Sequence, residues 1–123
     1  MPALTDNIAK TDYIGFWKGE APDYQRVTDF LNINKREASQ MAGVARTSVR
    51  YDDRIPSELA ERLEQIANIV NRVAAIFDGD LNKTSLWFRT LNPLLGEVSP
   101  RDMLRMDRYK RLAKFVIEAE QSQ

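Results

Sequence analysis

The chain has 123 residues, 43% of them hydrophobic and 29% charged, and its 18 basic and 18 acidic side chains leave no formal net charge. This composition is typical of a globular protein of one domain, or of two very small domains that share a core. The sequence contains no cysteine and no histidine, which excludes disulfides, Cys-His and Ser-His catalysis and the usual zinc and iron sites, and we expect no cofactor.

Residues 1–22 show little helical periodicity and are predicted to form an N-terminal arm. The first twenty residues include three acidic side chains and no apolar run, so they do not resemble a signal peptide. No stretch of the chain approaches the length of a membrane-spanning helix, and the expected location is the cytoplasm, without a membrane partner. The clustered aromatics Tyr13, Phe16 and Trp17 indicate that the arm packs against another part of the protein.

Helical periodicity begins at Asp23, whose charge favours the first turn of a helix. Two short helical pieces are predicted next, at 35–42 and 46–51, joined across Gly43. A turn follows, and the segment 58–77 then carries the clearest apolar stripe of the chain. At 1.5 Å per residue this helix would be roughly 30 Å long.

Three further helices are predicted in the C-terminal part, at about 81–90, 100–106 and 108–120. Asp80 can cap the first of them, and Ser99 followed by Pro100 is a typical start for the second. No segment alternates with the period of a β-strand. The sequence therefore predicts an all-α fold, in which an N-terminal helix-turn-helix bundle is joined by a long central helix to a small C-terminal helical domain.

The segment "KREASQMAGVARTSVRY" (35–51) has the spacing of a DNA-binding helix-turn-helix. Small residues stand where two helices would cross, Gly43 stands in the turn, and Val49 can pack the second helix onto the first. Arginine, serine and threonine side chains on the second helix are suited to base edges and phosphates in duplex DNA. The candidate DNA-binding residues are Lys35, Arg36, Arg46, Thr47, Ser48 and Arg50.

Other features of this segment favour a purely structural helical hairpin. Ala45 stands where a serine commonly caps the recognition helix, and Asp52 and Asp53 would repel phosphate. Residues 23–54 contain six basic and five acidic side chains. One copy would therefore bind DNA modestly, and we expect a homodimer or a larger assembly.

The C-terminal part carries a more specific pattern. It combines Ile76-Phe77, Gly79-Asp80, "WFRTLNPLLG" (87–96) and "SPRDML" (99–104) with a final amphipathic helix. Over about residues 24–120 the chain resembles bacterial antitoxins of the Xre/MbcA/ParS type. Two places depart from the family: Glu97, where a second glycine is common, and "MDRY" (106–109), where the family often has a threonine and a glycine.

The resemblance does not cover the arm at 1–22, which is predicted from the residue pattern alone. It implies an Xre-like helix-turn-helix domain at 23–77 and a toxin-binding domain at 78–123. It implies that the protein binds and neutralises a toxin, commonly of the NAD-consuming RES type, by covering the toxin's active site. It also implies that the protein represses its own promoter by binding its operator, a double-stranded DNA.

Within the motif, Trp87 and Phe88 are expected to fill space against the central helix. Pro93 ends the preceding helix, because the residue before a proline disfavours the helical conformation. Leu94 and Leu95 are expected to hold the loop to the core. The motif is thus interpreted as a rigid corner that orients the last two helices.

The last helix is expected to make the main toxin contact. On a helical projection Phe115 lies among charged side chains, where an aromatic is typical of a partner contact. The alternative is that Phe115 packs against the arm or a second subunit. Trp87 suits both the core and a partner platform. The candidate toxin-binding residues are Trp87, Arg89, Arg111, Lys114, Phe115 and Glu118.

Two other functions remain open. One is a stand-alone phage-like or partition-type DNA-binding regulator with a C-terminal dimerisation domain, which the helix-turn-helix suits equally well. The other is an enzyme, which is disfavoured because the sequence contains no clustered acid pair, glycine-rich phosphate loop or metal-ligand set.

Overall fold

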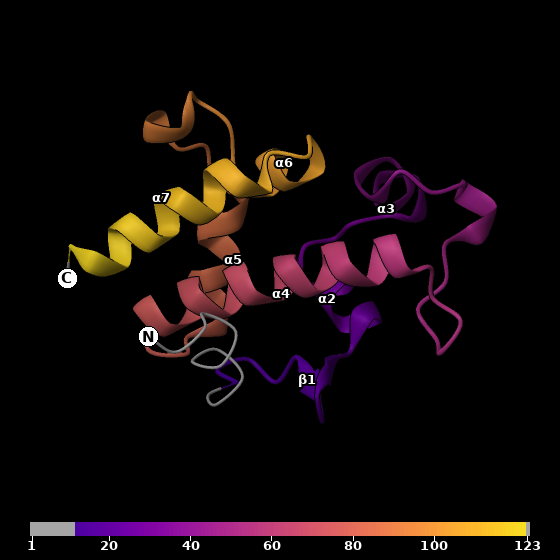
Figure 1. The fold of residues 1–123 in the computed structure, drawn as a ribbon. Coiled ribbons are helices and arrows are strands. Elements are labelled where there is room, and N and C mark those ends of the chain that lie inside the picture. Colours follow the sequence, from indigo (N-terminus) through magenta and orange to yellow (C-terminus); the bar gives the residue numbers. More distant parts are fainter. Residues whose placement is uncertain (1–11, 123) are drawn as a thin grey trace.

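The structure is a computed structural model that describes residues 12–122. In this part the chain forms six α-helices, two short 3-10 helices and a two-stranded hairpin (Figure 1). The α-helices are α2 (Tyr24–Phe30), α3 (Lys35–Ala42), α4 (Ser57–Ile76), α5 (Leu81–Arg89), α6 (Pro100–Arg105) and α7 (Tyr109–Gln121). The 3-10 helices are η1 (Arg46–Ser48) and η2 (Pro93–Leu95), and the strands are β1 (Trp17–Lys18) and β2 (Ala21–Pro22).

The mostly helical fold is confirmed, but the all-α prediction is wrong in the arm. There β1 and β2 pair antiparallel, with Trp17 opposite Pro22 and Lys18 opposite Ala21. The two-residue turn between them starts at Gly19, whose φ of 69° suits the turns that join tight hairpins. Strands of two residues are too short to show the alternation by which a strand is found in a sequence.

The arm packs against the helices, as predicted, within its described residues 12–22. Ile14 and Phe16 are buried, and the ring of Phe16 meets that of Phe30 edge to face at 5.5 Å. The backbone N–H of Tyr13 donates to the side-chain oxygen of Asn71 in α4 at 2.9 Å. The remainder of the predicted arm, 1–11, lies outside the described residues.

Helix α4 is the centre of the fold (Figure 1). It contacts α2, α3 and β2 of the N-terminal part and α5 and α7 of the C-terminal part. Leu59, Leu63, Ile66 and Val70 on this helix are fully buried. The hydrophobic core is one cluster with members from Ile14 to Val116, so it crosses the predicted boundary at 77/78. The division into two domains remains a prediction.

Ion pairs fix α7 alongside α4. Arg62 of α4 pairs with Asp107 and lies 4.4 Å from the ring centre of Tyr109, at the start of α7. Ten residues further along α4, Arg72 pairs with Glu120 near the end of α7. The two helices therefore run in the same direction. No helix within residues 12–122 has the length and apolar character needed to cross a membrane.

Arg101 joins α6 to the N-terminal part of the molecule. Its guanidinium donates to the backbone carbonyls of Leu31 and Asn32, the latter at 2.6 Å, and to the carboxylate of Glu37 at 3.2 Å. The Arg101 and Glu37 side chains are only 18% and 12% exposed. Charge-assisted hydrogen bonds of this kind are about twice as strong as neutral ones. This Arg101 network positions α6 against α3.

We predict that Arg101→Ala lowers the free energy of unfolding by about 2–3 kcal/mol. Two carbonyls would lose a charged donor, whereas Glu37 would keep Arg105 as an ion-pair partner at 3.4 Å. The expected cost is therefore that of about two charge-assisted bonds, each worth about 1.5 kcal/mol. Urea unfolding followed by circular dichroism measures the change. Arg108→Ala removes an exposed cation close by and should change stability by less than about 0.5 kcal/mol. Equal stabilities of the two variants would contradict this role of Arg101.

Candidate functional site

The expected first helix of the helix-turn-helix forms as α3 and is closed at both ends. The side chain of Asn34 accepts from the N–H of Glu37 at 2.8 Å, and the Glu37 carboxylate accepts from the N–H of Asn34 at 3.1 Å. This reciprocal capping box fixes the helix start. At the other end Gly43 has a φ of 70° and its N–H bonds to the carbonyl of Ser39. A glycine here relieves the strain that a side chain would add.

The prediction of a second helix at 46–51 is wrong. Only the single turn η1 forms, and Val49 behind it is extended and buried. Ala45 gives the turn no side-chain cap, and β-branched and hydroxyl residues such as Thr47 and Ser48 are poor helix formers. Because helix nucleation is costly, a segment of only six residues does not extend this single turn into a helix. The segment is an exposed tip of the molecule.

The six candidate DNA-binding residues are all exposed, but they do not form one helical face. Lys35 and Arg50 line one open hollow of about 390 Å³, together with Gln25, Tyr51 and Asp52. Arg46, Thr47 and Ser48 make up the η1 turn, and Arg36 stands beside Lys35 at the start of α3.

Arg50 is already paired within the molecule. Its Nε and Nη2 atoms lie 2.7 Å and 2.5 Å from the two carboxylate oxygens of Asp52. The bond from Arg50 lowers the pKa of Asp52 from 3.8 to about 2, and the same contact raises the pKa of Arg50. Because the pKa of Asp52 is depressed, the pair is fully formed above pH 3.8 and is lost only as the pH falls toward 2. Arg50 is therefore less available to DNA than the sequence suggested.

The candidate toxin-binding residues divide into an inner aromatic pair and an outer charged set. Trp87 and Phe115 are both half-buried, with ring centres 6.5 Å apart and planes at 63°. They line an apolar cavity of about 120 Å³ between α4, α5 and α7. Phe115 is thus half-buried against Trp87 and does not stand on an open polar face.

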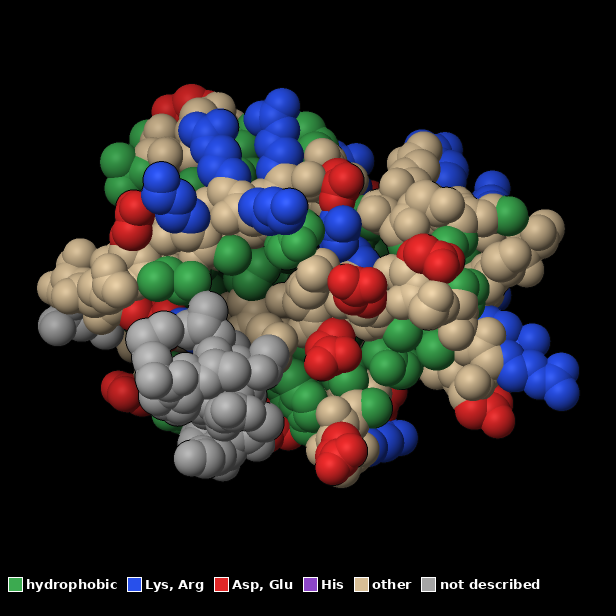
Figure 2. All heavy atoms as spheres, in the orientation of Figure 1, with side chains coloured by type: hydrophobic (Ala, Val, Ile, Leu, Met, Phe, Trp, Pro, Cys, Tyr) green, Lys and Arg blue, Asp and Glu red, His purple; other side chains and the backbone are tan. Residues whose placement is uncertain are grey.

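The outer set is exposed and mostly cationic. It consists of Arg89, Arg111, Lys114 and Glu118. Arg89 bonds to the hydroxyl of Ser85 in its own helix. Figure 2 shows Lys and Arg side chains gathered over α7, with hydrophobic side chains beside them toward the segment that joins α5 and α6.

That joining segment departs from the expected corner in one respect. Phe88 is fully buried and Leu95 is 4% exposed, as expected of residues that hold the segment to the core. Leu94, however, is 79% exposed, so the expectation that it pins the loop was wrong. Neighbouring residues of one 3-10 turn point in different directions, and only one of the two leucines can face the core.

Sequence reasoning also missed Leu86 and Leu91, which are 66% and 60% exposed. A signal was present for Leu86. Thr84 and Phe88, four residues apart, define the buried side of α5, and Leu86 midway between them must face outward at 100° per residue.

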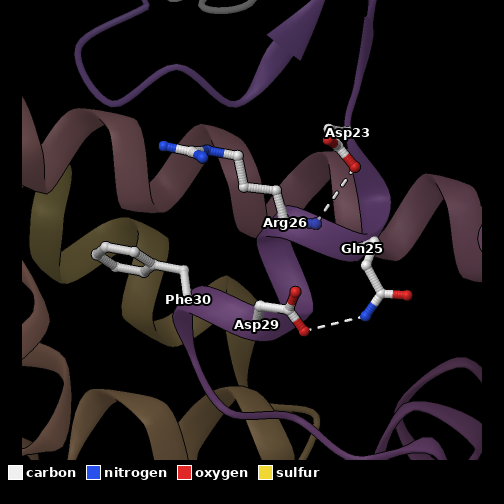
Figure 3. A pocket seen from close by; sticks show the side chains of 5 residues that line it. All are labelled: Asp23, Gln25, Arg26, Asp29 and Phe30. Carbon is white, nitrogen blue, oxygen red and sulfur yellow. Dashed lines mark hydrogen bonds between the residues drawn. The ribbon is translucent and has the colours of Figure 1, made fainter.

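A second open hollow, of about 490 Å³, lies along α2 (Figure 3). Its polar side chains are largely engaged with one another. Gln25 donates to Asp29 at 3.0 Å, the carboxylate of Asp23 accepts from the backbone of Arg26, and the Arg26 side chain donates to the carbonyl of Ile14. These contacts stabilise α2 and the arm, and they leave no convergent set of reactive groups.

Residues 12–122 contain no cluster of three acidic side chains that could hold a metal ion. Comparisons of the chain with protein-family models, with curated proteins and with solved structures found no match in any of the three. The function is therefore inferred from the surfaces of the molecule.

We predict that Asp52→Asn strengthens binding to duplex DNA by freeing Arg50. The affinity should become more sensitive to salt, with a slope steeper by about one counterion, because one more cation reaches a phosphate. Fluorescence anisotropy over a salt series measures both quantities. Asp53→Asn is the matched control, since it removes the same charge without breaking an ion pair in the described part of the chain. Equal gains in DNA affinity from the two variants would show that the ion pair with Asp52 does not keep Arg50 from DNA.

Proposed function

We propose that this protein is an antitoxin that binds and neutralises an NAD-consuming toxin of the RES type and represses its own promoter. The observation behind this proposal is how the segment 87–96, on which the family resemblance rests, divides between buried and exposed residues. The motif "WFRTLNPLLG" (87–96) could have been a buried connector. It is instead half core and half exposed surface, which is what a segment that both supports the fold and meets a partner requires.

The partner-binding role is supported by the charge of the last helix. Arg111 and Lys114 are exposed on α7, and Trp87 with Phe115 joins α7 to the exposed segment after α5. A continuous surface with aromatic support beneath and cations around it suits an acidic protein partner. The family resemblance implies that such a surface covers the active site of the toxin.

The DNA-binding role is supported by the exposed tip at η1 and the start of α3. Arg46, Lys35 and Arg36 extend into solvent there, and none of them is ion-paired with another residue of 12–122. This tip lies beyond the N-terminal end of α4, whereas α7 runs alongside the later part of that helix (Figure 1). The two partners can therefore bind at the same time. A single tip offers few contacts, so operator binding requires a homodimer or a larger assembly.

A stand-alone DNA-binding regulator is the second candidate. The α3–η1 tip supports it equally well, and the apolar surface near α5 would then join two copies of the chain. The neighbouring reading frame separates the two proposals, because an antitoxin requires a toxin gene beside its own.

Arg46→Ala should weaken binding to the operator by about 1–3 kcal/mol if Arg46 makes a two-pronged contact with guanine. The fold should be unaffected, because the side chain is exposed. Gel-shift titration with the promoter fragment and with a scrambled duplex measures the specific part. Lys83→Ala, an exposed cation on α5, is the control and should leave specific binding unchanged. Unchanged operator binding by Arg46→Ala would remove η1 from the DNA interface.

Reversing both charges in the variant Arg111→Glu/Lys114→Glu should abolish neutralisation of the toxin. Like charges would then face each other across the interface, which costs several kcal/mol. Co-expression with the toxin, followed by growth and cellular NAD, provides the measurement. Phe115→Ala is unsuitable here because it would also remove the contact with Trp87.

Arg54→Glu, a charge reversal at an exposed residue outside α5 and α7, is the control for that experiment and should still rescue growth. Operator binding by the double variant should match the wild type, because α7 lies away from the tip. Full rescue by the double variant would show that α7 does not contact the toxin.

A further inference from the structure

We propose that Leu86, Leu91 and Leu94, named here the leucine corner, are the principal docking element of this protein. Their occupant is an apolar socket, bordered by acidic side chains, on the protein partner. The proposal deepens the proposed function and rests on it, since the partner is the toxin. It moves the main contact from the face of α7 to the segment between α5 and α6.

Exposure singles out these three residues. Leu94 is 79%, Leu86 66% and Leu91 60% exposed, which are the highest values among the large hydrophobic residues of the described chain. All three fall within nine successive positions of the sequence. Single exposed leucines are ordinary on protein surfaces, but three of them on one helix end and the loop that follows are an unusual concentration of exposed apolar side chains.

The corner is held rigidly by its backbone. Asn92 donates its N–H to the carbonyl of Val98 at 3.0 Å, and the Asn92 carbonyl accepts from Leu95 at 2.9 Å and from Glu97 at 3.2 Å. The Asn92 side chain accepts from the N–H of Leu94 at 3.0 Å. The loop is thereby closed on itself. Ordering the backbone of such a loop costs little entropy on binding, so more of the burial energy of its leucine contributes to affinity.

The inner side of the corner is fastened to the core. Leu95 is buried next to exposed Leu94, and Phe88 is buried two positions after exposed Leu86. Trp87 lies between the exposed and buried sides, with its ring 5.1 Å from that of Phe88 and 6.5 Å from that of Phe115. The exposed leucines are therefore side chains that the surrounding packing turns outward, and not core residues that have come loose.

The charges in the corner and in the two helices that follow it favour an acidic partner. Residues 86–118 contain seven basic and four acidic side chains. Two of the acids are already neutralised, Asp102 by Arg105 and Asp107 by Arg62. Several cations on and beside α7 form no ion pair with any residue of 12–122. These are Arg108, Lys110, Arg111 and Lys114. Figure 2 shows such a cationic row next to hydrophobic side chains on the same face.

This combination favours an acidic protein over the other possible occupants. A second copy of the chain, placed by two-fold symmetry, would bring the same cations against one another. Duplex DNA would suit the cations but not three leucines, because its backbone and base edges are read mainly by polar groups. An apolar socket with an acidic border satisfies both parts of the surface.

The experiment measures the affinity of the full-length protein for the purified RES-type toxin encoded by the neighbouring gene. Leu94→Ser should raise the Kd about 10- to 100-fold, the range expected when one buried leucine is lost from an interface. Leu86→Ser should act similarly. Leu81→Ser is the matched control: this leucine is also exposed on α5, at 44%, but lies outside the corner. It should change the Kd less than about twofold.

The measurements separate the possible outcomes. Thermal unfolding checks that each variant folds, and if Leu94→Ser does not, Leu86→Ser decides. Wild-type affinity in the corner variants, together with intact toxin binding by the native protein, overturns the corner and leaves the proposed function standing. A native protein that binds no toxin overturns both.

Two further readouts test the choice of partner. Sedimentation should give the same mass for Leu94→Ser and the native protein, and operator binding should be equal. A corner variant that becomes a monomer assigns the surface to self-association, and one that loses operator binding assigns it to DNA. Either result overturns the proposal.

Discussion

The whole arrangement depends on the need to bury helix α4. Nine of its 20 residues are buried, and they include leucine, isoleucine and valine side chains along most of its length. A surface helix hides a single stripe from water, but α4 must be covered on more than one side. Neither the N-terminal elements nor the C-terminal ones can do this alone. The chain therefore folds back twice on α4, with α2 and α3 against one part and α5 and α7 against another.

Apolar burial brings these elements together, but it does not fix how they are oriented. Three arginines fix the orientation of these elements. Arg62 and Arg72 hold the two ends of α7 against α4, and Arg101 holds α6 against the carbonyls that follow α2 and against Glu37 of α3. Guanidinium groups suit this task because their planar donors bind carboxylates and carbonyls in defined geometries. The positions of the corner and of the η1 tip relative to each other follow from these contacts.

Local signals in the sequence predicted most helices, since caps and periodicity depend only on near neighbours. Asp80 and Ser99 do cap α5 and α6, and α3 ends at Gly43. The second helix of the expected motif failed because its apolar pattern was too short to outweigh a missing cap. Which of Leu94 and Leu95 faces the core, and which groups Arg101 contacts, depends on distant residues. No local pattern in the sequence could reveal them, whereas the spacing from Thr84 to Phe88 could have revealed Leu86.

Unusual backbone stands on both sides of α6. Glu97 has a φ of 63° and Asp107 a φ of 62°, a region that favours glycine. Such residues cost of order 1 kcal/mol each and persist only where their surroundings impose the conformation. Glu97 is held by the bond from its N–H to Asn92, and Asp107 by its ion pair with Arg62. The two strained residues flank α6. The bond between Glu97 and Asn92 closes the leucine corner, and the ion pair between Asp107 and Arg62 holds the start of α7. Together these two contacts set the direction in which α6 leaves the corner. The geometry of the exposed leucines is thus tied to the core through both ends of α6.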